Sequence, residues 1–91
     1  MTRLYIVEWD YWHLMAICKT EALAKSCIRN YMETIVEIGI GDEIVGDQVF
    51  VIMDSTMDYR GIHSTKESAQ LELDGYYAKD GFEVKEVKIL S

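Results

Sequence analysis

This chain of 91 residues contains no proline, only two cysteines and no apolar run long enough to span a membrane. Without proline, a native cis-prolyl bond and the slow folding phase that it causes are excluded. Cys18 and Cys27 lie in apolar surroundings and lack the paired spacing of a disulfide framework. The first ten residues lack the long uncharged segment of a signal peptide. These absences predict one soluble domain over residues 1–91, with reduced cysteines, in the cytoplasm.

Basic residues are also scarce: nine Lys and Arg stand against sixteen Asp and Glu, and the net charge is −7. Most of this imbalance lies in residues 42–91, which carry eleven acidic and five basic residues. Binding to a nucleic-acid duplex requires Lys and Arg to displace counterions, so the composition argues against direct nucleic-acid binding. An acidic surface suits a protein partner with a basic surface. The alternative is that the net charge serves solubility alone.

Motifs for catalysis, metal binding and nucleotide binding are missing as well. The soft metal ligands are the two cysteines together with His13 and His63, and they lack the close pairs of a zinc site. Gly39-Ile40-Gly41 begins like a phosphate loop, but the third glycine and the helix that should follow are absent. Nothing in the sequence indicates the burial that would shift the pKa of a carboxylate toward acid–base catalysis. We therefore expect a protein that is not an enzyme and that uses no metal or cofactor.

What the sequence does contain is an internal repeat. Residues 3–35 align without a gap with residues 48–80, forty-five positions later. Ile17 aligns with Ile62, and Thr20 aligns with Thr65. Only four aligned pairs are identical, so the shared apolar pattern and cap positions carry the alignment. Each copy reads as two strands followed by a helix.

Short, strongly apolar segments predict the strands of both copies, at residues 3–9, 12–18, 48–53 and 59–63, and the apolar runs of the first strands suggest burial on both faces. A helix with apolar residues three and four positions apart follows each pair of strands. Thr20 is expected to cap the first helix, whose apolar face continues as far as Ile35. Ser64 is expected to cap the second helix, over residues 66–79, with Glu67 completing a capping box.

The connecting segments complete the predicted fold. A short strand at residues 43–45 and a hairpin turn at Gly46-Asp47 are expected between the copies. Gly81 is expected to end the second helix in the left-handed conformation. A last strand follows over residues 82–90, with a bulge at Lys85-Glu86 where the alternation slips. The prediction is an α+β fold in which two helices cover one face of a mainly antiparallel sheet, with the copies related by a pseudo-twofold axis.

The most unusual local cluster is Trp9-Asp10-Tyr11-Trp12, which places both tryptophans at the tip of the first predicted hairpin. Trp and Tyr are enriched at binding hot spots because they bury a large area with few rotors to immobilise. The equivalent tip of the second copy is acidic and contributes Asp54, Asp58 and Tyr59. We expect these residues to bind a protein partner. The alternative is that both Trp rings cap the core and only Tyr11 is exposed.

A second hypothesis is a small-ligand binder, such as an oligomeric sponge for a signalling nucleotide. Binding a phosphate requires convergent cations, and Arg3, Arg29 and Arg60 are the candidates. A homodimer or higher homo-oligomer would bring copies of them together. Oligomerisation would also add stability to a domain of only 91 residues, and 49% apolar residues are enough to supply an interface.

The unit Tyr5-Ile6-Val7, a second strand and Lys19-Thr20-Glu21-Ala22-Leu23-Ala24 resembles a pattern common in small bacteriophage and prophage proteins. Its second appearance is His63-Ser64-Thr65-Lys66-Glu67-Ser68-Ala69. The compact, acidic, proline-free chain is similar to phage accessory proteins that inhibit host factors. Those include anti-CRISPR and anti-restriction proteins and scavengers of defence signalling nucleotides. The resemblance implies an inhibitor that acts in the host cytoplasm, and it assigns no binding residue.

Overall fold

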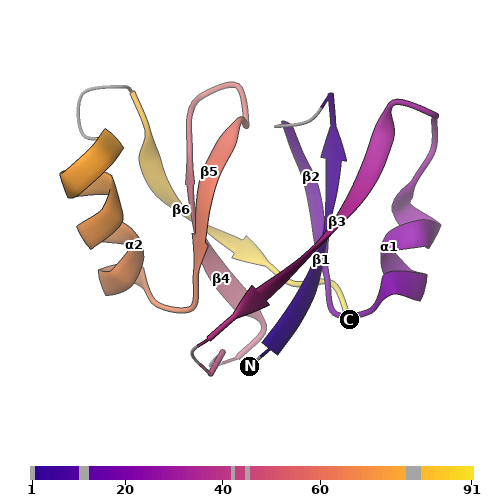
Figure 1. The fold of residues 1–91 in the computed structure, drawn as a ribbon, viewed down its shortest axis with the longest axis horizontal. Helices are drawn as coiled ribbons and strands as arrows, with labels where there is room; N and C mark the ends of the chain where they lie inside the picture. Colours follow the sequence, from indigo (N-terminus) through magenta and orange to yellow (C-terminus); the bar gives the residue numbers. More distant parts are fainter. Residues whose placement is uncertain (1, 11–12, 42, 45, 78–80) are drawn as a thin grey trace.

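The computed structural model describes residues 2–10, 13–41, 43–44, 46–77 and 81–91. They form two units, each with a three-stranded antiparallel sheet and a helix (Figure 1). The first unit consists of β1 (Thr2–Trp9), β2 (His13–Cys18), α1 (Glu21–Cys27) and β3 (Glu33–Ile40). The second consists of β4 (Gln48–Met53), β5 (Tyr59–His63), α2 (Lys66–Glu72), a π-helical turn η1 (Leu73–Tyr77) and β6 (Glu83–Lys88). The predicted α+β class is confirmed. No helix in these described ranges is long and apolar enough to cross a membrane.

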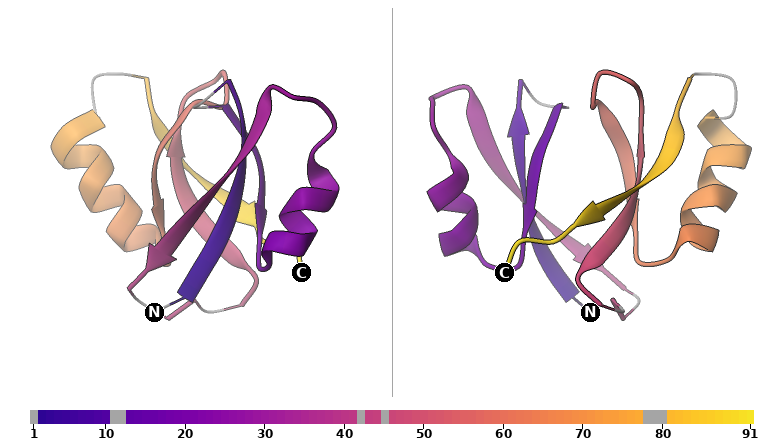
Figure 2. Two further views of the ribbon diagram at one scale, coloured as in Figure 1. Left: turned by 45° about the vertical axis from the view of Figure 1, so that its right-hand side comes forward. Right: turned by 180° about the vertical axis from the view of Figure 1, so that it is seen from behind.

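The two sheets face each other, and each carries its helix on the outer face (Figures 1 and 2). Leu4 of β1 and Val49 of β4 belong to the core between the sheets. Val7 packs under α1, and Ile52 packs under α2. The sequence predicted one sheet with both helices on one face, whereas the structure has two sheets. Because β1 and β4 are apolar on both faces, each needs a helix on one side and a second sheet on the other.

Local geometry repeats between the units with the predicted offset of forty-five residues. The Thr20 hydroxyl accepts from the Leu23 N–H at 3.1 Å, and the Thr65 hydroxyl accepts from the Ser68 N–H at 3.2 Å. Both threonines have nearly the same backbone angles. The pairing between the first two strands of each unit also shifts at one equivalent place, after Val7 in β1 and after Ile52 in β4. The strand–strand–helix part of the repeat is therefore present in three dimensions.

The repeat extends further than the sequence predicted, because β3 is a strand and not the end of a helix. α1 ends at Cys27 instead of Ile35, and β3 then pairs with β1 along its whole length. β-Branched residues dominate residues 34–36, which favours an extended chain, although their spacing also continues the helical pattern. Each unit is thus ββαβ, and β6 is the counterpart of β3.

The second copy is four residues longer than the first between its helix and its last strand. Leu4 pairs with Ile38, and its equivalent Val49 pairs with Val87. The sequence separation between equivalent residues of the two copies therefore grows from 45 in the first strands to 49 in the last strands. The extra residues coincide with η1, which continues α2 through Leu73–Tyr77. An insertion at this point explains why an ungapped alignment could not extend to the last strands.

Several local predictions at the connections were wrong. Thr65, not Ser64, caps α2, as the equivalence with Thr20 requires. Glu43 and Ile44 are not in a strand, so the turn at Gly46 closes no hairpin, although Gly46 has a positive φ of +79°. Val45 lies outside the described residues.

The last strand also differs in detail from its prediction. β6 spans Glu83–Lys88, and its pairing with β4 is continuous, so the bulge expected at Lys85-Glu86 is absent. Gly81 has the expected positive φ of +76°. The end of the second helix expected at residues 78–80 lies outside the described residues.

The two units are joined along the outer edge of β2, and we call this junction the seam. At the start of β2, His13 forms an antiparallel bridge with Asp58. At its other end, the Leu90 N–H donates to the Ile17 carbonyl at 2.8 Å, and the Lys19 N–H donates to the Leu90 carbonyl at 3.0 Å. Because His13 and Asp58 are forty-five residues apart and occupy equivalent positions, the pseudo-twofold axis passes between them.

Replacing Leu4 with Ala tests the core between the sheets. Leu4 is fully buried there, so Leu4→Ala should lower the free energy of unfolding by about 2–5 kcal/mol. The matched control is Leu71→Ala on the outer face of α2, where the side chain is exposed and the change should stay within about 0.5 kcal/mol. Equilibrium urea unfolding followed by circular dichroism measures both. Equal effects of the two changes would contradict this packing.

Candidate functional site

The seam brings the β1–β2 and β4–β5 tips to one end of the molecule (Figure 1). The Leu14 N–H donates to the Met57 carbonyl at 3.0 Å, which ties the two tips together. His13 Nδ1 lies 3.9 Å from Asp58 Oδ1. The Trp9 ring meets the His13 ring edge to face, with 5.7 Å between the ring centroids. Aromatic and acidic side chains from different copies therefore become neighbours, as the prediction of one binding surface requires.

The loop between α1 and β3 reaches the same end and adds two apolar side chains that the sequence prediction placed inside a helix. The Asp10 N–H donates to the Met32 carbonyl at 3.4 Å. Tyr31 is 93% exposed and Met32 is 41% exposed. Asp10, Tyr31, Met32 and Thr34 line a small hollow of about 130 Å³. We call the residues at this end the loop-end surface and define it by Trp9, Asp10, His13, Tyr31, Met32, Met57 and Asp58.

Among the described residues, four of the eight exposed large apolar side chains belong to the loop-end surface. Trp9 is 42% exposed and Met57 is 38% exposed, in addition to Tyr31 and Met32. The Trp9 side chain is therefore partly on the surface and is not only a cap on the core. Tyr11 and Trp12 lie outside the described residues, so their part in the surface stays a prediction.

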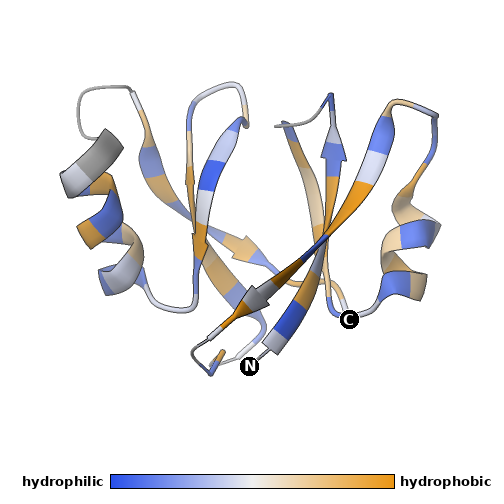
Figure 3. Ribbon diagram, viewed as in Figure 1, coloured by the Kyte–Doolittle hydropathy of each residue, from blue (hydrophilic) through white to orange (hydrophobic). Residues whose placement is uncertain are grey.

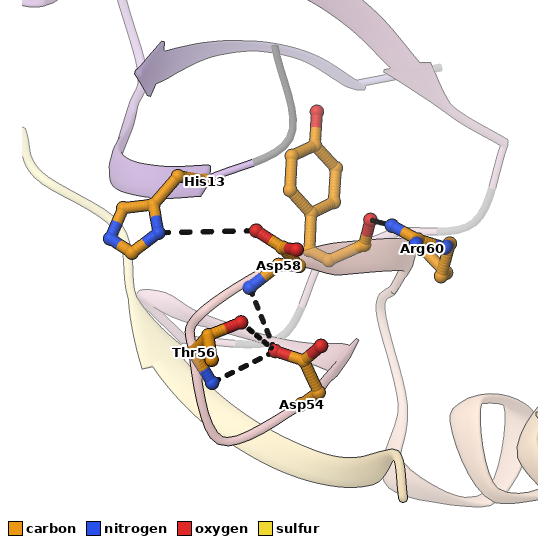
Figure 4. A network of polar contacts seen from close by, with 6 residues as sticks. His13, Asp54, Thr56, Asp58 and Arg60 are labelled. Atoms are coloured by element: carbon orange, nitrogen blue, oxygen red, sulfur yellow. Dashed lines mark hydrogen bonds and ion pairs between the residues drawn. The ribbon is translucent and has the colours of Figure 1, made fainter. Parts of the chain in front are cut away.

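Asp54 is largely occupied by its own turn. One of its carboxylate oxygens accepts hydrogen bonds from the Thr56 N–H, the Thr56 hydroxyl and the Asp58 N–H, at 2.7–3.1 Å (Figure 4). The hydrogen bonds from Thr56 are the main reason why the pKa of Asp54 lies below its usual value. Asp54 therefore shapes the tip that presents Met57 and Asp58, and only its second oxygen is left without one of these bonds.

Tyr59 does not belong to the loop-end surface, because its side chain is buried between the sheets. Its hydroxyl donates to the carboxylate of Glu8, which is also buried. Burial, together with this hydrogen bond, raises the pKa of the Tyr59 phenol. The equivalent residues of the other copy are Leu14 and Met53, which are both in the same core. One side of the pseudo-twofold axis thus carries a polar pair where the other side is apolar.

The three arginines of the ligand-binding hypothesis occupy separate places. Arg3 forms an ion pair of 2.9 Å with Glu37 of β3. Arg29 is exposed in the loop after α1. Arg60 donates to the Tyr59 carbonyl at 3.0 Å and lies over the Phe82 ring, with 5.2 Å between the guanidinium carbon and the ring centroid. Within one chain these contacts give no convergent phosphate site.

A cluster that the sequence did not reveal lies between β5 and α2. His63 Nδ1 is 2.9 Å from Ser68 Oγ, and His63 Nε2 is 3.3 Å from Glu72 Oε2 without hydrogen-bond geometry. A Cβ on Gly61 would collide with the Glu72 carboxylate, so glycine is needed for Glu72 to lie over β5. The contact of Ser, His and Glu resembles a hydrolase triad, but it is packed between helix and sheet. We interpret it as a contact that fixes α2 on β5.

The first copy carries different chemistry at the same place. Cys18 and Cys27 are the counterparts of His63 and Glu72, and both belong to the apolar cluster under α1. Both cysteines are free thiols. Burial is the main reason why the pKa of Cys18 rises to about 11. Among the residues that the structure describes, no group of three or more His, Cys, Asp or Glu is arranged to hold a metal ion.

Removing the buried hydrogen bond between Tyr59 and Glu8 tests the asymmetry between the copies. Tyr59→Phe leaves the Glu8 carboxylate buried without its partner and should destabilise the fold by about 1–3 kcal/mol. The double variant Glu8→Met/Tyr59→Phe imitates the apolar pair of the other copy and should return to within about 1 kcal/mol of wild type. Urea unfolding measures wild type and both variants. A double variant that is less stable than Tyr59→Phe alone would show that the two side chains are not coupled.

Comparison with protein-family models, with curated proteins and with solved structures found no match for this chain. The function proposed below therefore depends on the geometry of the loop-end surface.

Proposed function

We propose that this protein is a non-enzymatic interaction module that binds a basic segment of another protein through its loop-end surface. The observation that carries the proposal is the concentration of exposed Trp9, Tyr31, Met32 and Met57 beside carboxylates at one end of the molecule. Exposed apolar side chains with a polar rim are typical of protein-binding sites. The seam positions side chains from both copies, so the surface exists only when the whole domain is folded.

The hollow beside Asp10 suggests what the surface recognises. Its lining combines an acid, Asp10, with an aromatic and an apolar residue, Tyr31 and Met32. A volume of about 130 Å³ suits one side chain and is far below the roughly 300 Å³ of a typical small-molecule site. A Lys or Arg side chain fits this chemistry because its aliphatic stem packs on apolar walls while its cation meets the acid and the aromatic ring.

The net charge of −7 supports the same partner class. A negative field steers a basic protein surface toward the acidic end and speeds association at low ionic strength. An inhibitor of a host or defence protein, as the resemblance to phage accessory proteins implies, is one form of this function. The nucleotide sponge is less well supported, because Arg3, Arg29 and Arg60 are held at separate places within one chain.

Capture from a bacterial lysate tests the proposal with Tyr31→Ala and Asp10→Asn as the informative baits. Both side chains are exposed, so neither change should disturb folding. Truncating a central aromatic hot spot costs about 2 kcal/mol, and Tyr31→Ala should therefore weaken capture about thirtyfold. Asp10→Asn should mainly slow association and reduce its salt dependence.

The matched control is Leu71→Ala, which removes an exposed apolar side chain from α2 without touching the loop-end surface. This variant should capture the same proteins as wild type. If Tyr31→Ala and Asp10→Asn fold and retain the wild-type set of proteins in wild-type amounts, the loop-end surface is not the binding site.

A further inference from the structure

The two sheets end in outer strands of very different character. β2 and β5 lie at the seam, whereas β3 and β6 are the outer strands of their sheets. β3 is eight residues long, contains neither Lys nor Arg, and pairs with β1 without a bulge. Figure 3 shows apolar positions along its length. A long, regular edge strand that is mainly apolar, with Glu33 and Glu37 as its charged residues, offers a template for pairing with another strand.

The edge of β6 carries the protection that β3 lacks. Four of its six residues are charged, and Lys85 forms an ion pair of 3.4 Å with Glu83. Val36 pairs with Ile6, and Lys85 pairs with Val51, which is the equivalent of Ile6. Lys85 therefore occupies in β6 the place that Val36 holds in β3. Lys on an edge strand opposes edge-to-edge pairing, whereas Val36 is 37% exposed and favours it.

The hydrogen-bond pattern shows which backbone groups of β3 are free for pairing. The Asp10 N–H donates to the Met32 carbonyl, which continues the β1–β3 ladder beyond Trp9. Because antiparallel ladders alternate, even-numbered residues of β3 bond to β1 and odd-numbered residues point outward. The Glu33 N–H agrees with this pattern, since it bonds to Asn30 and not to β1. Among the described residues, the backbone N–H and C=O groups of residues 35, 37 and 39 form no hydrogen bond with another segment.

From this edge we infer that β3 pairs with β3 of a second copy of the chain, antiparallel and with Val36 at the twofold axis. The outward-pointing backbone groups belong to odd-numbered residues, so each odd-numbered residue of β3 must pair with an odd-numbered residue of the second copy. This pairing requires the twofold axis to pass through a residue and not between two neighbouring residues. The two residues at the centre of β3 are Val36 and Glu37. An axis at Glu37 would place two carboxylates directly opposite each other, which is destabilising. An axis at Val36 places Val36 against Val36 and Ile35 against Glu37.

This register suits the remaining side chains. Glu33 faces Gly39, so no like charges stand directly opposite each other anywhere between residues 33 and 39. Arg3 already neutralises Glu37 through its ion pair. A twofold contact of this kind closes on itself and joins the two β3-bearing sheets into one sheet of six strands. Thr34 lies in β3 and also lines the hollow beside Asp10, but the dimer is tested by its mass in solution and the loop-end surface by capture of a partner, so either proposal can fail without the other.

Molecular mass in solution tests the dimer, measured by light scattering during size exclusion at concentrations from about 10 µM to about 1 mM. The wild-type mass should rise with concentration from 10.5 kDa toward twice that value. Added salt should strengthen the association, because each chain carries a net charge of −7 that salt screens.

Val36→Lys copies the residue of β6 into β3 and should abolish the rise in mass, because it places two cations at the axis. The matched control is Leu71→Lys, which makes the same change in charge at an exposed site on α2 and should dimerise like wild type. A Val36→Lys protein that dimerises like wild type would overturn the proposal.

Hydrogen exchange provides a second test of the proposed dimer. In the wild-type dimer at high concentration, the amides of Ile35, Glu37 and Gly39 should become protected relative to the dilute protein. Even-numbered amides of β3 should be protected in both samples, since they bond to β1. A wild-type mass that stays at 10.5 kDa up to about 1 mM, or a dimer without protection of those three amides, overturns the proposal.

Discussion

Both faces of the central strands β1 and β4 are apolar, and this constraint decides how the rest of the chain is arranged. On one face, Val7 and Ile52 are covered by the helices. On the other face, Leu4 and Val49 are buried only because the second sheet covers them. Neither ββαβ unit can bury both faces of its central strand alone, so the two units must fold together. The seam, the pseudo-twofold axis and the meeting of the two hairpin tips follow from that requirement.

The two copies keep the same backbone and differ in side chains at equivalent places. Val36 and Lys85 stand at one outer-edge position, and His63 has Cys18 as its counterpart under the helix. The polar pair of Glu8 and Tyr59 has an apolar counterpart in Met53 and Leu14. The second unit thus has a protected edge, while the first has an open edge and the aromatic tip. Both proposed interaction surfaces therefore include residues of the first unit.

The sequence predicted the α+β class and the strand–strand–helix part of the repeat, because short apolar runs and polar helix caps are local signals, although Ser64 was expected as the second cap where Thr65 serves. It missed β3, since the apolar spacing through Ile35 fits a helix as well as a strand and only pairing with β1 decides between them. Tyr31 and Met32 were assigned to a buried helix face for the same reason. Tyr59 was placed on the surface because no local signal reveals its buried partner Glu8, fifty-one residues away.

Native-state hydrogen exchange tests most directly whether the two units fold as one. The amides of Ile6 in β1 and Val51 in β4 occupy equivalent places in the two central strands and are fully buried. If each unit needs the other to cover its inner face, both amides should exchange only through global unfolding, with opening free energies equal within about 1 kcal/mol. One unit opening several kcal/mol more easily, while the other stays protected, would contradict the mutual dependence of the two sheets.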